Sequence, residues 1–358
     1  MMFDTGAGRR AAVIGTGLIG GSIGLALRER GWYVTGTDHD PGAAARALEL
    51  GAIDAVGSDP DADITFIAAP VRSITDEAKR ALDVTKGAVT DVGSVKSSIV
   101  SAVGAARFVG GHPMAGSEQL GVDGASPSLF EGAVWVLTPV EDTDNAVYAL
   151  VASVVASLGA EVVALAPERH DALVAVVSHV PHLTAAALME IADERAEEHA
   201  ALLRLAAGGF RDLTRIAAGS PAIWPDICEE NSVAITGVID ALIAELSDLR
   251  DVIRKGDGAS LLETLERAHR ARRNLPSRVV RPSEVAEVRV PVPDRQGVLA
   301  EVTTLASELG VNIADLEIAH SSEGDAGVLI LLVDVTRVAA FQEGLADRGY
   351  RPAVRFLE

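Results

Sequence analysis

The chain has 358 residues, of which 48% are hydrophobic and 23% charged, and its formal net charge is −20. Single hydrophobic cores stop growing below this length, so two or three domains are expected. The acidic charge argues against a nucleic acid or an anionic membrane as partner, because either needs a surface rich in Lys and Arg. The only cysteine, Cys228, excludes an intrachain disulfide, and residues 1–10 lack the apolar run of a signal peptide. Both features fit a reducing cytoplasm.

Residues 1–165 have the pattern of an α/β domain. Short apolar runs alternate with helix-length segments, which is typical of a parallel sheet and predicts an N-terminal Rossmann domain. In chain order the runs are AAVIG, YVTGTD, ITFIAAP, AVTDVGS, AVWVLTP and EVVAL.

A glycine-rich loop follows the first predicted strand and opens a helix. Its GxGxxG spacing lets the backbone approach a pyrophosphate at a helix N-terminus, and Asp38 ends the second strand at the distance where an acid meets the adenosine ribose. An acid there favours NAD over NADP, because it repels a 2′-phosphate. A turn that packs helix on sheet without a ligand is the alternative. The predicted cofactor-binding residues are Gly15, Gly17, Leu18, Ile19, Gly20 and Asp38.

Two polar positions near the predicted carboxyl edge of the sheet are candidates for catalysis. His112 follows the strand-like RFVG in a Gly-Pro loop, and an imidazole is a competent base near neutral pH. Its alternative role is a histidine satisfied by backbone groups. Ser94, just after another strand, can bond the cofactor or a substrate hydroxyl, and it can also cap the next helix.

Residues 166–276 carry apolar positions at helical spacing and predict an all-helical domain. Ser178 and His182 lie four apart, on one helix face if Pro181 is tolerated. The histidines here lack the spacing of known zinc motifs, so no metal is expected. Arg215 can grip a carboxylate, or it can form a surface ion pair with Asp212. Trp224 fits either a pocket wall or the core.

The C-terminal part begins after a segment, residues 275–287, that suits a linker because it contains two prolines and no clear period. Residues 285–358 then alternate in the order βαββαβ, which predicts a ferredoxin-like domain.

Five strings in order, GTGLIGGSIGLAL, DVGSVK, GGHPMAGSE, SHVPHL and GGFRDLTRIA, resemble the prephenate dehydrogenase family of tyrosine biosynthesis. The resemblance runs from about residue 11 to residue 249. The C-terminal unit, with DRQGVL and GVNI, resembles the ACT domain, which binds amino acids.

This resemblance implies oxidative decarboxylation of prephenate by NAD to 4-hydroxyphenylpyruvate. His112 is then the base for the ring hydroxyl, Ser94 orients that hydroxyl, and Arg215 holds the ring carboxylate. Substrate-binding roles are implied for Ser117, Glu118, Ser178, His182, Asp212, Arg215 and Trp224.

The resemblance further implies a homodimer formed through the helical domain. Gly297 and Asn312 match the positions around which ACT domains hold an amino acid, so tyrosine feedback is expected, with a purely structural dimerisation module as the alternative. Two other functions stay open: arogenate as the substrate, and a non-catalytic sensor of NAD and an amino acid. A β-hydroxyacid dehydrogenase fits poorly, because such enzymes rely on a lysine in the helical domain and none occurs between Lys96 and Lys255.

Overall fold

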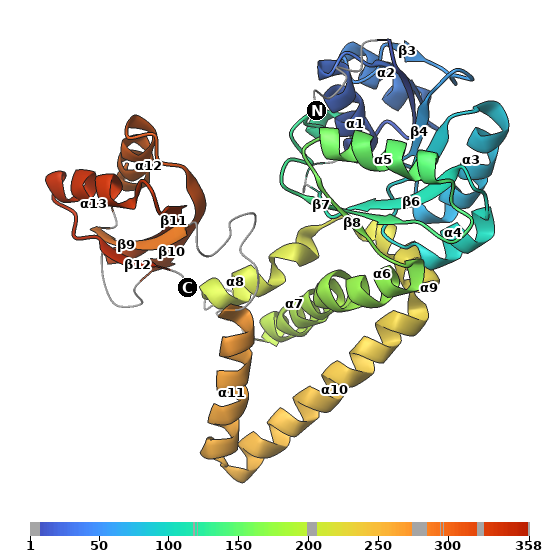
Figure 1. The fold of residues 1–358 in the computed structure, drawn as a ribbon. Coiled ribbons are helices and arrows are strands. Elements are labelled where there is room, and N and C mark those ends of the chain that lie inside the picture. Colours follow the sequence, from blue (N-terminus) through green and yellow to red (C-terminus); the bar gives the residue numbers. More distant parts are fainter. Residues whose placement is uncertain are drawn as a thin grey trace. The chain divides into compact units, whose positions relative to one another are not determined.

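The computed structural model describes residues 8–116, 119, 121–198, 206–273, 285–293, 295, 297–320 and 326–356. The chain divides into two compact units, residues 1–251 and residues 252–358. Figure 1 labels their helices and strands.

The first unit contains a twisted eight-stranded sheet with the order β3-β2-β1-β4-β5-β6-β7-β8. The expected Rossmann architecture is confirmed, with one difference: β7 runs antiparallel to β6. Parallel neighbours need a long crossover, usually a helix, and the described part of residues 114–133 contains only the short turn η1, Val122–Gly124. The strands are β1 Arg10–Ile14, β2 Tyr33–Thr37, β3 Ala55–Val56, β4 Ile64–Ile67, β5 Ala88–Asp91, β6 Phe108–Pro113, β7 Val134–Thr138 and β8 Glu161–Ala164.

Helices cover both faces of this sheet and form two apolar layers. The helices α1 (Leu18–Glu29), α2 (Pro41–Glu49) and α5 (Asn145–Ser157) bury side chains such as Ile23, Ala47 and Val151 on one face. On the other face, α3 (Val71–Val84) and α4 (Ser97–Val103) bury Ile74 and Ile99. Burial of these side chains provides the main stabilisation of the domain.

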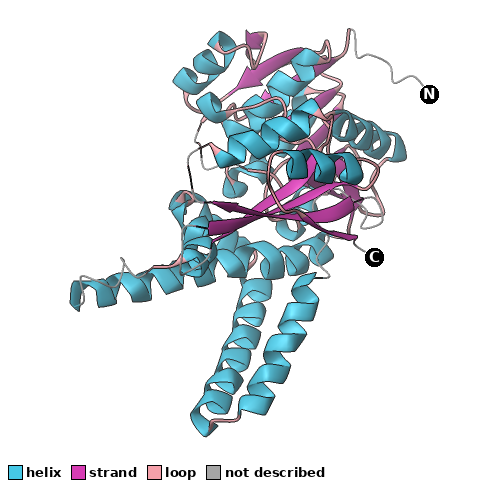
Figure 2. Cartoon of the chain, turned by 90° about the vertical axis from the view of Figure 1, so that its left-hand side faces the viewer, coloured by secondary structure: helices cyan, strands magenta, loops and turns pink. Residues whose placement is uncertain are grey.

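A helical segment follows the sheet, and every element among its described residues is a helix. Figure 2 draws the helices of the chain in cyan. Its first helix crosses Pro181, which cannot donate to the carbonyl four residues before it. A π-helical turn, η2, ends two residues before this proline, and the helix continues past it. The elements are α6 Pro167–Val174, η2 Ala175–His179, α7 Val180–Glu198, α8 Gly208–Thr214, η4 Arg215–Ala218, η5 Pro221–Ile223, α9 Trp224–Glu230 and α10 Ser232–Lys255.

The second unit contains an antiparallel sheet with the order β10-β11-β9-β12 and two helices packed on it. This βαββαβ arrangement confirms the ferredoxin-like prediction. Val288, Val302, Leu331 and Phe341 lie in its core. The elements are α11 Gly258–Arg273, β9 Val285–Pro293, α12 Val298–Glu308, β10 Ile313–His320, β11 Ala326–Asp334, α13 Val338–Asp347 and β12 Ala353–Phe356.

Candidate active site

The glycine-rich loop between β1 and α1 has the geometry of a dinucleotide cradle. Gly15 has φ +94°, and a Cβ there would lie 2.2 Å from the Ala68 carbonyl oxygen, so only glycine fits. A Cβ on Gly20 would lie 1.9 Å from the Gly15 oxygen. Gly17, by contrast, faces open space, and α1 begins there without a side-chain cap. The first N–H groups of α1 are therefore available to a phosphate.

Asp38 lies beside this loop, directly after β2. Its Oδ2 accepts hydrogen bonds from the Thr16 backbone N–H at 2.7 Å and from Thr16 Oγ1 at 3.3 Å. The carboxylate is thereby held at the carboxyl edge of β1 and β2, which pair in parallel. Each carboxylate oxygen accepts more than one hydrogen bond, so ribose hydroxyls can still bind. The residues present fit NAD.

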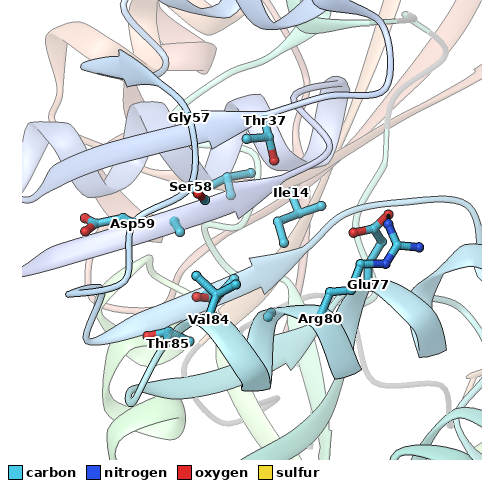
Figure 3. A pocket seen from close by; sticks show the side chains of 13 residues that line it. Ile14, Thr37, Gly57, Ser58, Asp59, Glu77, Arg80, Val84 and Thr85 are labelled. Atoms are coloured by element: carbon cyan, nitrogen blue, oxygen red, sulfur yellow. Dashed lines mark hydrogen bonds and ion pairs between the residues drawn. The ribbon is translucent and has the colours of Figure 1, made fainter.

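A hollow of about 170 Å³ lies on the sheet face beside α3 (Figure 3). The connection from β3 to β4, residues 57–63, contains no helix to cover this face. Ile14 and Thr37, the last residues of β1 and β2, line one part of it and bring it next to Asp38. The hollow shares no lining residue with the histidine cluster described below, so the two are separate features of the domain.

His112 lies within β6, whereas the sequence suggested a loop after the strand. Residues 110–113 pair with β7, and this pairing extends the strand through Pro113. His112 is 9% exposed, and its Nδ1 lies 2.8 Å from Nε2 of His170. His170 Nδ1 in turn lies 2.8 Å from Asp171 Oδ1. The alternative of a histidine satisfied by backbone groups is therefore wrong: a second imidazole holds His112.

The surroundings of His112 keep it neutral. Burial lowers the pKa of His112 well below its usual 6.5, and the neighbouring His170, Lys96 and His179 lower it further, against the opposing effect of Asp171. A neutral imidazole near neutral pH can accept a proton, as a general base must.

Ser94 is half-buried between β5 and α4, and it does not cap α4 as the alternative role proposed. Asp171 performs that function instead, because its carboxylate accepts the backbone N–H of Lys96 at 2.9 Å and of Ser97 at 2.8 Å. Ser94 therefore does not cap this helix, and its hydroxyl can bind a ligand.

A second cluster joins the helical segment to these residues. The amide of Asn231 donates to the Asp171 carbonyl at 2.9 Å and contacts His179 Nδ1 at 3.2 Å. His182 stacks on Trp224 with ring centroids 3.8 Å apart. Burial lowers the pKa of His179 to about 4 and also lowers the pKa of His182.

Three further predicted substrate residues lie on the helical segment. Ser178 is half-buried in η2, while Asp212 and Arg215 are exposed on α8 and η4. Gly219, just after η4, lies against the ring of His182, so the segment that carries Arg215 borders the second cluster. Ser117 and Glu118 lie outside the described residues. Within the described ranges, no group of three potential metal ligands is arranged to hold an ion.

The sequence analysis missed three buried polar residues that the structure places around His112: His170, Asp171 and Lys96. A signal existed, since His170 and Asp171 stand in the first helix after the last predicted strand of the Rossmann domain. Nothing local, however, relates that position to His112, which lies 58 residues earlier.

Comparison with known proteins assigns this arrangement to a family. Residues 23–164 match the prephenate dehydrogenase nucleotide-binding domain, and residues 166–267 match the prephenate dehydrogenase dimerization domain. The prephenate dehydrogenase of Bacillus subtilis is 34% identical over 88% of this chain and 89% of its own length. This chain belongs to the prephenate dehydrogenase family.

Solved structures agree with the family assignment. A structure of Aquifex aeolicus prephenate dehydrogenase in complex with hydroxyphenyl propionate and NAD+ has a TM-score of 0.70 at 32% identity, and covers 75% of this chain and 98% of that one. Synechocystis arogenate dehydrogenase has a TM-score of 0.66 at 31% identity, with coverage of 75% and 100%. NAD is therefore the cofactor that the family membership and the cradle at Gly17 both indicate.

Proposed function

We propose that this chain catalyses the NAD-dependent oxidative decarboxylation of prephenate to 4-hydroxyphenylpyruvate. The observation that carries the proposal is a neutral, buried His112 at the edge of a Rossmann sheet whose glycine loop and Asp38 fit NAD. Bound NAD supplies the hydride acceptor.

The chain's own residues handle the proton and the orientation of the substrate. His112 accepts the proton of the ring hydroxyl while a hydride leaves the carbon that bears this hydroxyl and the ring carboxylate departs as carbon dioxide. Ser94 holds the hydroxyl in line with His112. Burial around both residues keeps water from competing for the base.

Substrate binding is assigned to residues that border this centre. Arg215 holds the ring carboxylate through two parallel hydrogen bonds, and Asp212 places Arg215. The His182–Trp224 stack forms a wall of the pocket, supported by the 3.8 Å ring contact. The other proposed substrate-binding residues are Ser178, Ser117 and Glu118.

We propose three domains: a Rossmann domain of residues 1–165, a helical domain of residues 166–276 and a C-terminal domain of residues 285–358. We infer that two copies of the chain pair through the helical domain. Large apolar side chains are exposed on its helices, among them Val177 at 66% and Ile243 at 56%. The run Pro167–Arg195 is long and apolar enough to cross a membrane by length and composition alone. It also carries the buried Asp171 and His179, which suits a protein interface better than lipid.

The C-terminal domain is assigned a regulatory role as an ACT domain that binds tyrosine. Gly297 caps the start of α12, while Asn312 lies beyond its end, where the Val311 N–H bonds the Ala306 carbonyl at 2.8 Å. An 11-residue helix is about 16 Å long. The two residues of one chain are thus too far apart for one small ligand, so a shared site requires two copies.

The test is formation of NADH or NADPH by the purified chain with prephenate and, separately, with arogenate, each with NAD or NADP and with or without tyrosine. Turnover of prephenate with NAD, inhibited by tyrosine, is expected. Turnover of arogenate but not of prephenate would change the assigned substrate and leave the proposed mechanism unchanged. Tyrosine binding without turnover of either compound would favour a sensor. The single cysteine, Cys228, fits a reducing compartment, and we propose that the enzyme works in the cytoplasm.

A further inference from the structure

Three buried side chains form a line that ends at the proposed base. His112 Nδ1 contacts His170 Nε2 at 2.8 Å, and His170 Nδ1 contacts Asp171 Oδ1 at 2.8 Å. Their exposures are 9%, 0% and 5% in that order. The two imidazole rings are tilted by 73°, so they meet at an edge through a hydrogen bond and are not stacked.

The hydrogen-bond partners of Asp171 fix the direction of this line. Burial raises the pKa of Asp171, but hydrogen bonds from His170, Ser97 and Lys96 outweigh burial and lower the net pKa. An ionised carboxylate only accepts hydrogen bonds, so His170 Nδ1 carries a proton. When this is the only proton on the ring, His170 accepts at Nε2, His112 donates from Nδ1, and Nε2 of His112 is left with its lone pair.

We propose that His170 and Asp171 are positioning residues that hold His112 in the tautomer whose Nε2 accepts the substrate proton, a role that rests on the proposed function of His112 as the base. After proton transfer, His112 is a cation that donates to His170, whose ring Asp171 polarises. No proton has to reach Asp171.

Other charged and titratable groups also face His112. Lys96 precedes α4, His179 comes from η2, and both lower the pKa of His112, whereas Asp171 raises it. Removing the charge of Asp171 therefore shifts the acid limb of kcat/KM to lower pH, a change that a purely structural defect does not produce.

The first test compares Asp171→Asn with Asp144→Asn. Each aspartate accepts two backbone N–H groups at the start of a helix, but only Asp171 touches a histidine. In Asp171→Asn, the new amide donates to His170, and the proton of His112 moves to Nε2. We expect kcat to fall on the order of 10²- to 10⁴-fold, with the KM for prephenate within about threefold. Asp144→Asn keeps its kcat. Equal kcat values in both variants would overturn the proposal.

The second test needs no turnover and no substitution at His170 or Asp171. Nitrogen NMR of the full chain labelled with ¹⁵N-histidine, with NAD present and His112 assigned by the signals lost in His112→Asn, reports which ring nitrogen carries the proton. A proton on Nδ1 in the unmodified chain supports the proposal, and a proton on Nε2 overturns it. If prephenate is not turned over at all, the proposed function fails, while this measurement still decides the tautomer.

Discussion

Lys96 and Asp91 form an ion pair with no exposed side-chain surface, next to the strand residue that precedes His112. The Lys96 ammonium also donates to the Gly111 carbonyl at 2.8 Å, while Asp91 accepts the Gly111 N–H at 3.0 Å. Both peptide groups of Gly111 are thus anchored from β5 and its following loop. The pair fixes the end of β6, and with it the backbone position of the base.

Lys96→Met removes one partner of this pair and leaves Asp91 buried without its cation. Breaking a buried ion pair from one side costs about 3–5 kcal/mol. We expect the free energy of unfolding, measured by urea denaturation, to fall by about that amount. Lys86→Met, at an exposed lysine of the same domain, is the control and should change stability little. A loss below about 1 kcal/mol in Lys96→Met would contradict the assignment.

Asp38→Ser tests the cofactor site. The substitution removes the charge that repels a 2′-phosphate and a charge-assisted hydrogen bond to the ribose, which is worth about 1.5–3 kcal/mol. We expect the Kd for NAD to rise about tenfold or more, and the preference for NAD over NADP to shrink. Asp40→Ser, at the exposed cap of α2, controls for loss of charge and keeps a good capping residue. Both Kd values are measured by fluorescence titration. An unchanged ratio of the Kd for NADP to the Kd for NAD in Asp38→Ser would exclude Asp38 from ribose binding.

The folded protein should lose stability in mild acid, partly through His179. Its pKa is lowered from 6.5 to about 4 in the folded state, so the unfolded chain binds the proton more readily. The stabilisation is complete above pH 6.5 and decreases as the pH falls to about 4, by roughly 3 kcal/mol at most. His179→Gln should flatten the dependence of unfolding free energy on pH across this window. His269→Gln, at an exposed position of α11, should leave the slope as it is.

The predicted dimer can be tested on α10. Ile243 and Leu246 are 56% and 53% exposed and lie on one face of this helix. Replacing both with Arg should convert the dimer to a monomer in sedimentation velocity, because buried unpaired charges oppose association. Leu48→Arg, at a 43% exposed residue of α2 in the Rossmann domain, is the matched control. A dimer that persists in the double variant would place the interface elsewhere.

The sequence predicted local features well and distant contacts poorly. The glycine loop was predictable because its spacing, strand and helix are contiguous, and Gly15 and Gly20 are each required by the close backbone approach now seen. The reversal of β7 was not predictable, since its direction depends on a connection whose described residues contain only the short 3-10 turn η1. The two-residue strand β3 was too short to carry an alternating pattern.

In the candidate active site, too, local features were predictable and distant contacts were not. Ser94 and His112 could be selected from chemistry near strand ends. The partners of His112 could not, because His170 and Asp171 reach it only through packing of α6 against the sheet domain. The π turn before Pro181 was also not predictable. It arises because the proline lacks an N–H group, and no periodicity in the sequence predicts it.

The central claim is that His112 acts as the base of an NAD-dependent dehydrogenase. Its most direct test is NADH formation from prephenate and NAD by the unmodified chain and by His112→Asn, with NAD affinity measured for both. We predict turnover in the unmodified chain and a kcat lower on the order of 10²- to 10⁴-fold in His112→Asn, with the Kd for NAD unchanged. Equal turnover by the two proteins, with NAD binding retained, would contradict the account.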